Sequence, residues 1–224
     1  MCGRFVQAQS AQSYADHFGA TPAASVALDP SWNVAPTDRV YAVAEHDGER
    51  TLGTFKWGLI PWYAESPKVA AKHINARAET LASKAAFKDS FERRRCIVPA
   101  DGFYEWERLE AGGKLPHFFH SADDRPLALA GLWASWRDPE GERITTCTIV
   151  TTKPDELVAR IHDRMPAILP EGGWDRWLDP GFGDLRALLA MLRGAAAGPL
   201  AEHAVSTLVN DVKNNYPECV EPLR

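Results

Sequence analysis

The residue that first suggests chemistry is Cys2, which directly follows Met1 in the sequence MCGRF. Methionine aminopeptidases remove Met1 when the second residue is small, so the mature chain would begin with an α-amine and a thiol on neighbouring carbons. Both groups are partly nucleophilic near neutral pH, because their ordinary pKa values are about 8 and about 8.5. The amine can form a Schiff base with an aldehyde, and the thiol can then close a five-membered thiazolidine ring. A cysteine at position 2 also occurs by chance, so this interpretation needs support from other residues.

The segment INARAET, residues 74–80, places an amide and a cation two positions apart, at Asn75 and Arg77. In extended backbone these two side chains point to the same side. A carboxamide can orient a reacting group, and a guanidinium can bind a phosphate through two parallel hydrogen bonds. A strand end followed by a helix N-cap would give the same pattern, and the motif alone does not separate the two interpretations.

The segment GFYEWER, residues 102–108, places Glu105 between two aromatic residues. If this segment is a strand, Phe103, Glu105 and Glu107 share one face. A carboxyl group among apolar neighbours has a raised pKa, which suits general acid–base catalysis. An edge-strand glutamate that faces water is the alternative interpretation.

Among the histidines, His162 is the best candidate for proton transfer, because it lies in IHDRMP at the expected end of a helix. Histidine exchanges a proton near pH 7, although a histidine that only caps a helix would occupy the same place. His117 and His120 would lie on opposite faces of a strand, which disfavours metal binding. The four cysteines form no Cys-x-x-Cys pair, so we expect no metal and no cofactor.

Aromatic residues lie close in sequence to a basic segment. The chain has a net charge of −5, but residues 66–95 contain eight basic and three acidic residues and so carry +5. Trp32 lies in WNVAPT, and Trp57, Trp62 and Tyr63 lie in KWGLIPWY. Aromatic rings beside cations are typical of proteins that bind single-stranded nucleic acids. A solvated helix face would also explain the charges, and core packing would explain most tryptophans, Trp57 in particular.

The composition is that of a cytosolic globular protein. The chain has 224 residues, of which 45% are hydrophobic and 25% charged, which is ordinary for a soluble domain. The N-terminus has no apolar signal-peptide core, and no apolar run approaches the ~20 residues of a membrane helix. The four cysteines lie far apart, so a disulfide framework is not suggested. We therefore predict a protein of the reducing cytoplasm.

Hydrophobic periodicity and turn residues predict the elements that must position these side chains. Residues 21–36 are expected to form a loop. Helices are expected at 9–18, 82–94, 155–162, 174–178 and 184–193. Strands are expected at 40–46, 51–57, 95–100, 102–108, 116–122, 127–133, 144–152 and 204–209. Strands dominate the middle of the chain, which favours a single α+β domain over residues 1–224, with a core of about 2–214, built on a largely antiparallel sheet or open barrel with peripheral helices.

Seven sequence blocks, in order, resemble those of the SRAP family, the SOS response-associated peptidases that crosslink to abasic sites in DNA. The blocks extend from residue 1 to about residue 214, and they are MCGRF, NVAPT, WGLIP, INARAET, GFYEW, IHDRMP and VSTLVNDVKN. The resemblance implies an SRAP-like fold and a role in DNA repair and the DNA damage response. It implies that the N-terminal cysteine forms a covalent thiazolidine with an abasic site in single-stranded DNA. It also implies an autocatalytic peptidase, or hydrolase, activity that exposes Cys2, and lyase-type chemistry.

The resemblance also implies which residues do the work. The family's catalytic positions match Cys2, Asn75, Glu105 and His162. Its DNA-binding positions match Arg4, Pro36, Trp62, Arg77 and Trp106, although WGLIPWY departs from the usual spacing of tryptophans in that loop. The expected partner is single-stranded DNA that contains an abasic site, with single-strand/double-strand junctions also favoured. We expect a monomer that has no membrane contact and is associated with the nucleoid when it is bound to DNA.

Two other functions fit parts of the sequence. One is an N-terminal-nucleophile hydrolase that cleaves peptides in trans, with Cys2 as nucleophile and His162 as base. The other is a non-covalent reader of modified bases. The basic segment at 66–95 has no role in the hydrolase, and Cys2 has none in the reader.

Overall fold

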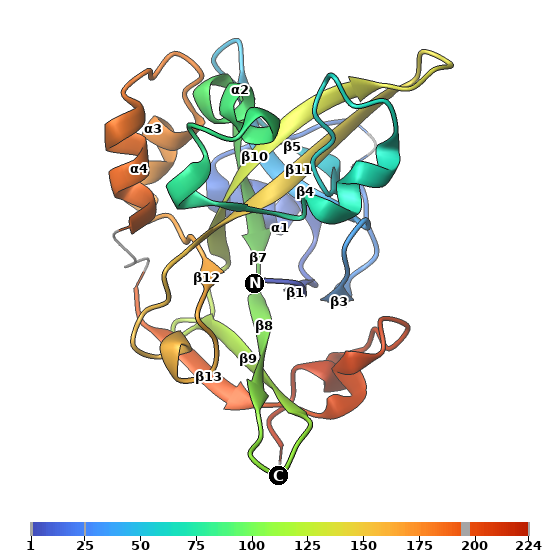
Figure 1. The fold of residues 1–224 in the computed structure, drawn as a ribbon, viewed down its shortest axis with the longest axis vertical. Coiled ribbons are helices and arrows are strands. Elements are labelled where there is room, and N and C mark those ends of the chain that lie inside the picture. The colour runs from blue at the N-terminus through green and yellow to red at the C-terminus, as the bar shows by residue number, and fades with distance from the viewer. Residues whose placement is uncertain (1, 25, 194–197, 224) are drawn as a thin grey trace.

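The computed structural model describes residues 2–24, 26–193 and 198–223 (Figure 1). Five strands form a barrel. In spatial order they are β11 (Arg143–Thr152), β10 (Leu127–Arg137), β7 (Arg95–Ala100), β4 (Arg39–His46) and β5 (Glu49–Trp57). These neighbours are antiparallel, and a parallel pairing of Cys147 on β11 with Trp57 on β5 closes the ring. Three short strands add to its edges: β2 (Thr21–Pro22), β6 (Asn75–Arg77) and β12 (Met165–Pro166).

A second, antiparallel sheet continues from the barrel in the lower half of Figure 1. Its order is β13 (Leu200–Ala204), β9 (Lys114–Ser121), β8 (Gly102–Arg108), β1 (Phe5–Gln7) and β3 (Ser31–Val34). β7 runs into β8 through Asp101, whose carboxylate accepts hydrogen bonds from the Ala8 amide at 2.7 Å and the Tyr14 hydroxyl at 2.8 Å. This junction fixes the second sheet, and β1 within it, against the barrel.

Alternation along the strands separates the two largest hydrophobic clusters of the described residues. Helices α1 (Ala11–Phe18), α2 (Ala85–Arg93), α3 (Trp174–Leu178) and α4 (Leu185–Arg193) cover one face. On β4, Tyr41 and Val43 belong to the cluster that contains these helices, whereas Val40 and Ala42 belong to the other cluster. Because the strands close into a ring, the face turned away from the helices is the barrel interior. Cys2 belongs to this interior cluster.

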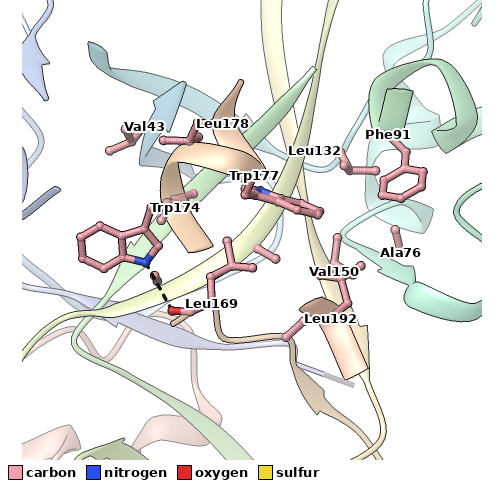
Figure 2. Packing of buried hydrophobic residues seen from close by; sticks show 14 of the residues in the cluster. Val43, Ala76, Phe91, Leu132, Val150, Leu169, Trp174, Trp177, Leu178 and Leu192 are labelled. Atoms are coloured by element: carbon pink, nitrogen blue, oxygen red, sulfur yellow. Dashed lines mark hydrogen bonds between the residues drawn. The ribbon is translucent and has the colours of Figure 1, made fainter. Parts of the chain in front are cut away.

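Figure 2 shows the helix-covered cluster around the short helix α3. Its two tryptophans lie among side chains contributed by the strands, such as Val43, Leu132 and Val150. Trp177 is fully buried, and its indole N–H donates to the Cys96 carbonyl at 2.8 Å. The indole N–H, the one polar group of this large buried side chain, therefore has its hydrogen-bond acceptor on the barrel strand β7.

The remaining helical segments are 3₁₀ turns. They are η1 (Pro67–Lys72), η2 (Ala78–Thr80), η3 (Val158–Arg160), η4 (Glu171–Gly173), η5 (Thr207–Asn210) and η6 (Pro217–Cys219). Within the described residues, no helix combines the length and the apolar character needed to cross a membrane.

Most of the predicted elements are confirmed, and so is the α+β class. The strands predicted at 95–100 and 102–108 have those bounds in the structure. Gly19 ends α1 in the left-handed conformation, with φ of 59°, which glycine adopts without strain. The loop predicted at 21–36 does contain two short strands, β2 and β3. Residues 194–197, in the stretch between α4 and β13, lie outside the described residues.

Two predicted elements were wrong. The helix predicted at 155–162 is only the single turn η3. The Asp155 carboxylate accepts from the Val158 amide at 2.8 Å, and the chain must then return to pair as β12 with β11, which leaves no length for a helix. The strand predicted at 204–209 was also misplaced. β13 ends at Ala204, and η5 follows it, begun by the Ser206 side chain.

Candidate active site around Cys2

Strand β1 carries Cys2 into the interior of the molecule. Phe5 pairs with Phe103 of β8, and the Tyr104 amide donates to the Arg4 carbonyl at 3.0 Å. The Cys2 thiol lies 3.8 Å from the same carbonyl oxygen. Cys2 is completely buried. Residues 2–4 therefore lie alongside the strand that carries Glu105.

Asn75 contacts Cys2 from the barrel side. β6 pairs in parallel with β11, with Asn75 beside Ile149. From this position the Asn75 amide nitrogen donates to the Cys2 carbonyl oxygen at 2.7 Å. Its other side-chain atom, Oδ1, is buried and has no hydrogen-bond partner among the described residues. Because Asn75 lies in a strand, Arg77 points to the same side, and its side chain is exposed.

Glu105 is the acidic group of the site. It lies on β8 and is only 2% exposed. Burial raises the pKa of its carboxyl group from 4.5 to about 7, because an ionised carboxylate loses its hydration there. Burial, and then the charge of Glu105, raise the pKa of the Cys2 thiol well above its usual range. The thiol is therefore protonated at neutral pH and lies within the electrostatic reach of Glu105.

His162 approaches Glu105 from the turn after η3. Its Nε2 lies 3.8 Å from a Glu105 carboxylate oxygen, and its Nδ1 lies 3.0 Å from the Arg164 backbone nitrogen. Burial lowers the pKa of His162, which favours the neutral imidazole. Arg164 connects this turn to the barrel, because its guanidinium donates to the carbonyl of Thr151 on β11 at 2.7 Å. The same guanidinium donates to both carboxylate oxygens of Glu79, at 2.7 and 3.0 Å.

A groove of about 760 Å³ opens beside Glu105 and His162. Trp106 and Ile161 contribute to its walls, and its cationic lining residues are Arg108, Lys114 and Arg160. The structure thus brings together the four side chains predicted to be catalytic and places an open space next to them. An amide, a carboxyl group that titrates near neutral pH and a neutral imidazole can orient groups and move protons around Cys2.

The predicted DNA-contacting residues differ in exposure. Trp62 is 71% exposed, and its ring meets that of Tyr63 edge-on with centroids 5.7 Å apart. Pro36 is half-buried in the turn that precedes β4, and Trp106 is half-buried against the core. Trp57, in contrast, is fully buried, as the packing interpretation predicted.

Arg4 is connected to the C-terminal part of the chain. Its guanidinium donates to Asn33 Oδ1 at 2.6 Å, to the Val209 carbonyl at 2.8 Å and to the Asn210 carbonyl at 3.5 Å. These bonds use three of the five N–H groups of an arginine side chain. The phosphate contact expected of Arg4 stays a prediction, and it has two donors left to use.

Sequence reasoning missed two asparagines of this region. Asn33 is 3% exposed, and its amide donates to the carbonyls of Val209, Asp211 and Asn214 at 3.2, 3.0 and 2.8 Å. Asn210 Oδ1 accepts from the Trp106 indole N–H at 2.6 Å. Both residues lie inside the blocks NVAPT and VSTLVNDVKN, but an asparagine in a short block gives no signal of its partner.

The basic segment at 66–95 presents less charge than its composition suggests. Arg95 is 2% exposed and donates to backbone carbonyls of the helices. Arg94 forms an ion pair with Asp89. The exposed cations of this segment include Lys68, Lys72 and Arg77. In the described part of the chain, no three His, Cys, Asp or Glu side chains gather in a way that could hold a metal ion.

Comparison with known proteins gives a consistent set of relatives. The family model described as SOS response associated peptidase (SRAP) matches residues 1–212. The chain is 40% identical over 222 residues to the abasic site processing protein YoqW of Bacillus subtilis, covering 99% of both chains. It is 36% identical over 226 residues to the abasic site processing protein HMCES of Gallus gallus, covering 87% of this chain and 66% of that protein.

Solved structures show the same architecture. A crystal structure of a protein from Bacteroides thetaiotaomicron superposes with a TM-score of 0.88 at 25% identity and covers all of both chains. A second, from Bordetella bronchiseptica, has a TM-score of 0.77 at 30% identity and covers 92% of this chain and 100% of the other. The barrel with its attached second sheet is therefore shared with these structures.

Proposed function

Because the chain belongs to the SRAP family, whose relatives at 36–40% identity are named abasic site processing proteins, we propose that it processes abasic sites in DNA. The proposed reaction is a covalent crosslink between Cys2 and the aldehyde of an abasic site in a single strand. The crosslink would shield the lesion as part of the DNA damage response.

One observation supports this chemistry above all. Completely buried Cys2 lies within reach of an amide, Asn75, and of Glu105, whose pKa is raised to about 7 and which is itself 3.8 Å from His162. An N-terminal aminothiol needs groups that exchange protons near neutral pH, and these are such groups. A non-covalent reader of bases needs neither the cysteine nor the raised pKa.

The reaction requires a free amine on Cys2, so the bond between Met1 and Cys2 must first be hydrolysed. We propose that the site can do this itself, as a cysteine autopeptidase, although an aminopeptidase acting on the new chain would give the same product. Hydrolysis consumes one water and releases methionine. The Asn75 side chain then holds the backbone of Cys2 through its hydrogen bond of 2.7 Å to the Cys2 carbonyl. Its Oδ1, which has no hydrogen-bond partner among the residues that the structure describes, can accept a hydrogen bond from the new amine.

The first covalent step joins the amine to the sugar. In its protonated form, which the lowered pKa makes the minor one, His162 donates a proton to the ring oxygen of the abasic deoxyribose. The C1′ hydroxyl gives its proton back to the neutral imidazole, and the ring opens to the aldehyde. The Cys2 amine adds to the aldehyde carbon, and loss of one water gives the imine. This role is supported by the position of His162, which is half-exposed beside buried Glu105, at the solvent side of the site.

The second step closes the thiazolidine. The Cys2 sulfur bonds to the imine carbon, the thiol proton goes to Glu105, and Glu105 passes it on to the nitrogen. Overall, one water leaves for each crosslink. A base is needed because burial holds the thiol protonated. Glu105, with a pKa of about 7, can take this proton and return it, and in the reverse direction it would assist ring opening and release.

DNA is held around the reacting sugar by phosphate and base contacts. We propose that exposed Arg77 and the remaining donors of Arg4 bind the flanking phosphates, with Pro36 contacting the strand beside them. Trp62 and Trp106 would stack on bases next to the gap. Such stacking on two sides favours a kinked strand or a single-strand/double-strand junction.

The test is incubation with a single-stranded oligonucleotide that carries one abasic site, followed by denaturing electrophoresis. We expect a heat-stable shifted band with wild type and none with Cys2→Ala. The variant keeps an amine, so borohydride should still trap its imine. Cys219→Ala, which removes a buried thiol from a different core cluster, is the matched control and should crosslink normally.

Three outcomes would reject the proposal. They are a heat-stable band in Cys2→Ala, a band with a tetrahydrofuran analogue that has no aldehyde, and DNA-independent cleavage of peptides in trans as the principal activity. Intact mass must accompany each assay. A preparation that retains Met1 has a blocked amine and should form no thiazolidine.

A further inference from the structure

We propose that Asn210 is a positioning residue that holds the Trp106 indole in its DNA-stacking orientation and couples it to Arg4. Asn210 lies in residues 207–215, here named the closing segment, which belongs to the last block of the sequence and which the proposed chemistry leaves without a role. The inference rests on the proposed function in one respect, namely that Trp106 contacts the DNA strand.

Asn210 contacts both residues through different atoms. Its side-chain Oδ1 accepts from Trp106 Nε1 at 2.6 Å, and its backbone carbonyl accepts from Arg4 Nη2 at 3.5 Å. Trp106 is on β8, directly after Glu105, and Arg4 is two residues after Cys2. A single residue, Asn210, thus links Trp106, which follows Glu105, to Arg4, which lies between Cys2 and β1.

The closing segment is held rigidly enough for this purpose. The buried Asn33 amide binds carbonyls of residues 209, 211 and 214 at 3.2, 3.0 and 2.8 Å, and Arg4 Nη1 bridges Asn33 Oδ1 and the Val209 carbonyl. The Asn214 side chain donates back to the Leu208 carbonyl at 2.8 Å. These bonds fix the backbone on both sides of Asn210.

The Asn210 side chain, in contrast, is exposed, so its bond to Trp106 adds little to the buried core. Trp106 packs with one face against the cluster that contains Tyr104, with ring centroids 6.4 Å apart. The hydrogen bond at the indole N–H restricts the Trp106 ring to one orientation. A ring that is already fixed loses less conformational entropy when a base stacks on it. The bond therefore serves ligand binding more than folding.

The test compares Asn210→Leu, which keeps the branched shape of the side chain but removes the acceptor, with Asn210→Asp, which keeps an acceptor. Protein labelled with 5-fluorotryptophan is examined by ¹⁹F NMR, with the Trp106 signal assigned from its loss in Trp106→Phe. We expect Asn210→Leu to shift and broaden the Trp106 signal and Asn210→Asp to leave it sharp. The thermal midpoint of Asn210→Leu should move by less than about 2 °C.

Binding is measured with a strand that carries a tetrahydrofuran abasic analogue, which cannot crosslink. We expect Asn210→Leu to weaken binding about fivefold and to leave the crosslinking rate at saturating abasic DNA unchanged. Trp106→Phe lacks the indole N–H. In a protein that already carries Trp106→Phe, adding Asn210→Leu should therefore cause no further loss of binding affinity. Equal losses from Asn210→Leu in both backgrounds, or an unchanged Trp106 signal, would overturn the proposal.

The design separates this inference from the proposed chemistry. If wild type binds the strand but forms no crosslink with a true abasic site, the covalent function fails, while the double-mutant cycle can still support the role of Asn210. If wild type does not bind the strand, the role of Asn210 in DNA binding is rejected together with the proposed function.

Discussion

Glu105 is a buried ionisable residue, and burial of an ionised carboxylate costs free energy of folding. A residue with this cost is expected to have a role in function. Its pKa of about 7 means that both protonation states are populated at neutral pH. The neighbouring thiol of Cys2 is held in its protonated form. The proposed chemistry therefore depends on whether Glu105 is ionised when the thiol must lose its proton.

This dependence predicts a pH profile. With Glu105 as base, the rate of crosslink formation at saturating DNA should fall about tenfold for each unit below pH 7 and level off above it. Single-turnover assays between pH 5 and pH 9 measure the profile. In Glu105→Gln the rate should be reduced at all pH values and the inflection near 7 should disappear. An unchanged inflection in that variant would assign the titration to another group.

The same carboxyl group should also make folding stability depend on pH. Its pKa is raised in the folded state from 4.5 to about 7, so the unfolded chain ionises first as pH rises. Stability is therefore fully present below about pH 4.5 and is lost as pH rises through 7, by about 3 kcal/mol in total. Urea unfolding at pH 5 and pH 8 should show this loss in wild type, a smaller one in Glu105→Gln, and the wild-type loss in the exposed control Glu110→Gln.

At the scale of elements, Arg95 joins two helices to the barrel. It is the first residue of β7, and its guanidinium donates to the carbonyls of Phe91 and Glu92 at the end of α2, at 2.8 and 2.7 Å. It also donates to the Trp177 carbonyl of α3 at 2.7 Å. Carbonyls at helix ends have no partner within the helix, so a buried cation at their C-termini satisfies them and matches the helix dipoles.

Replacement of Arg95 should therefore be severe. Arg95→Leu leaves several carbonyls at the ends of both helices without donors, and we expect a loss of about 3 kcal/mol or more in the free energy of unfolding. The exposed neighbour Arg93 is the matched control, and Arg93→Leu should change stability by no more than about 0.5 kcal/mol. Equal effects of the two substitutions in urea unfolding would contradict the capping role.

The strands were predictable because their signal is local. Alternating apolar residues and turn signals between them placed β7, β8 and the β4–β5 hairpin, whose turn has positive φ at Asp47 and Gly48. The region 155–162 failed because a pattern that suits a helix was overruled by the pairing of β12 with β11. The site residues were found from motifs, but the bonds of Asn33 and Asn210 join positions about two hundred residues apart in the chain, and no local pattern records such a distance.

At the scale of the whole molecule, the proposed function requires an acidic protein to bind an anionic strand. The chain carries −5 overall, and some cations of the basic segment are used inside the fold, as with Arg95. Electrostatic attraction therefore depends on a small number of exposed groups close to the site, such as Arg77. Under the proposed function, most of the binding energy would then come from base stacking and from the covalent bond.

The salt dependence of binding tests this balance. With two phosphate contacts, log Kd for a non-crosslinking strand should rise with log salt with a slope of only about 1.4, and Arg77→Ala should reduce the slope by about 0.7. Fluorescence anisotropy at about 50 to about 300 mM salt, a range over which the Debye length falls about 2.4-fold, gives the slope. Arg143→Ala, at the opposite end of β11 from the site, should leave it unchanged. A slope above about 4 would indicate a much wider phosphate-binding surface.

The link between Arg4 and Val209 spans 205 positions of the chain, and this has a consequence for biosynthesis. The ribosome releases Cys2 long before it makes the closing segment, β8 or the turn that carries His162. During that interval the cysteine is not yet in the interior, where it later has no exposed surface. Processing enzymes in the cell therefore have their access to the first peptide bond while translation continues. Under the proposed function, the aminothiol of Cys2 is open to cellular aldehydes during this interval, and it becomes shielded from them only when the late segments fold around it and its partner residues are in place.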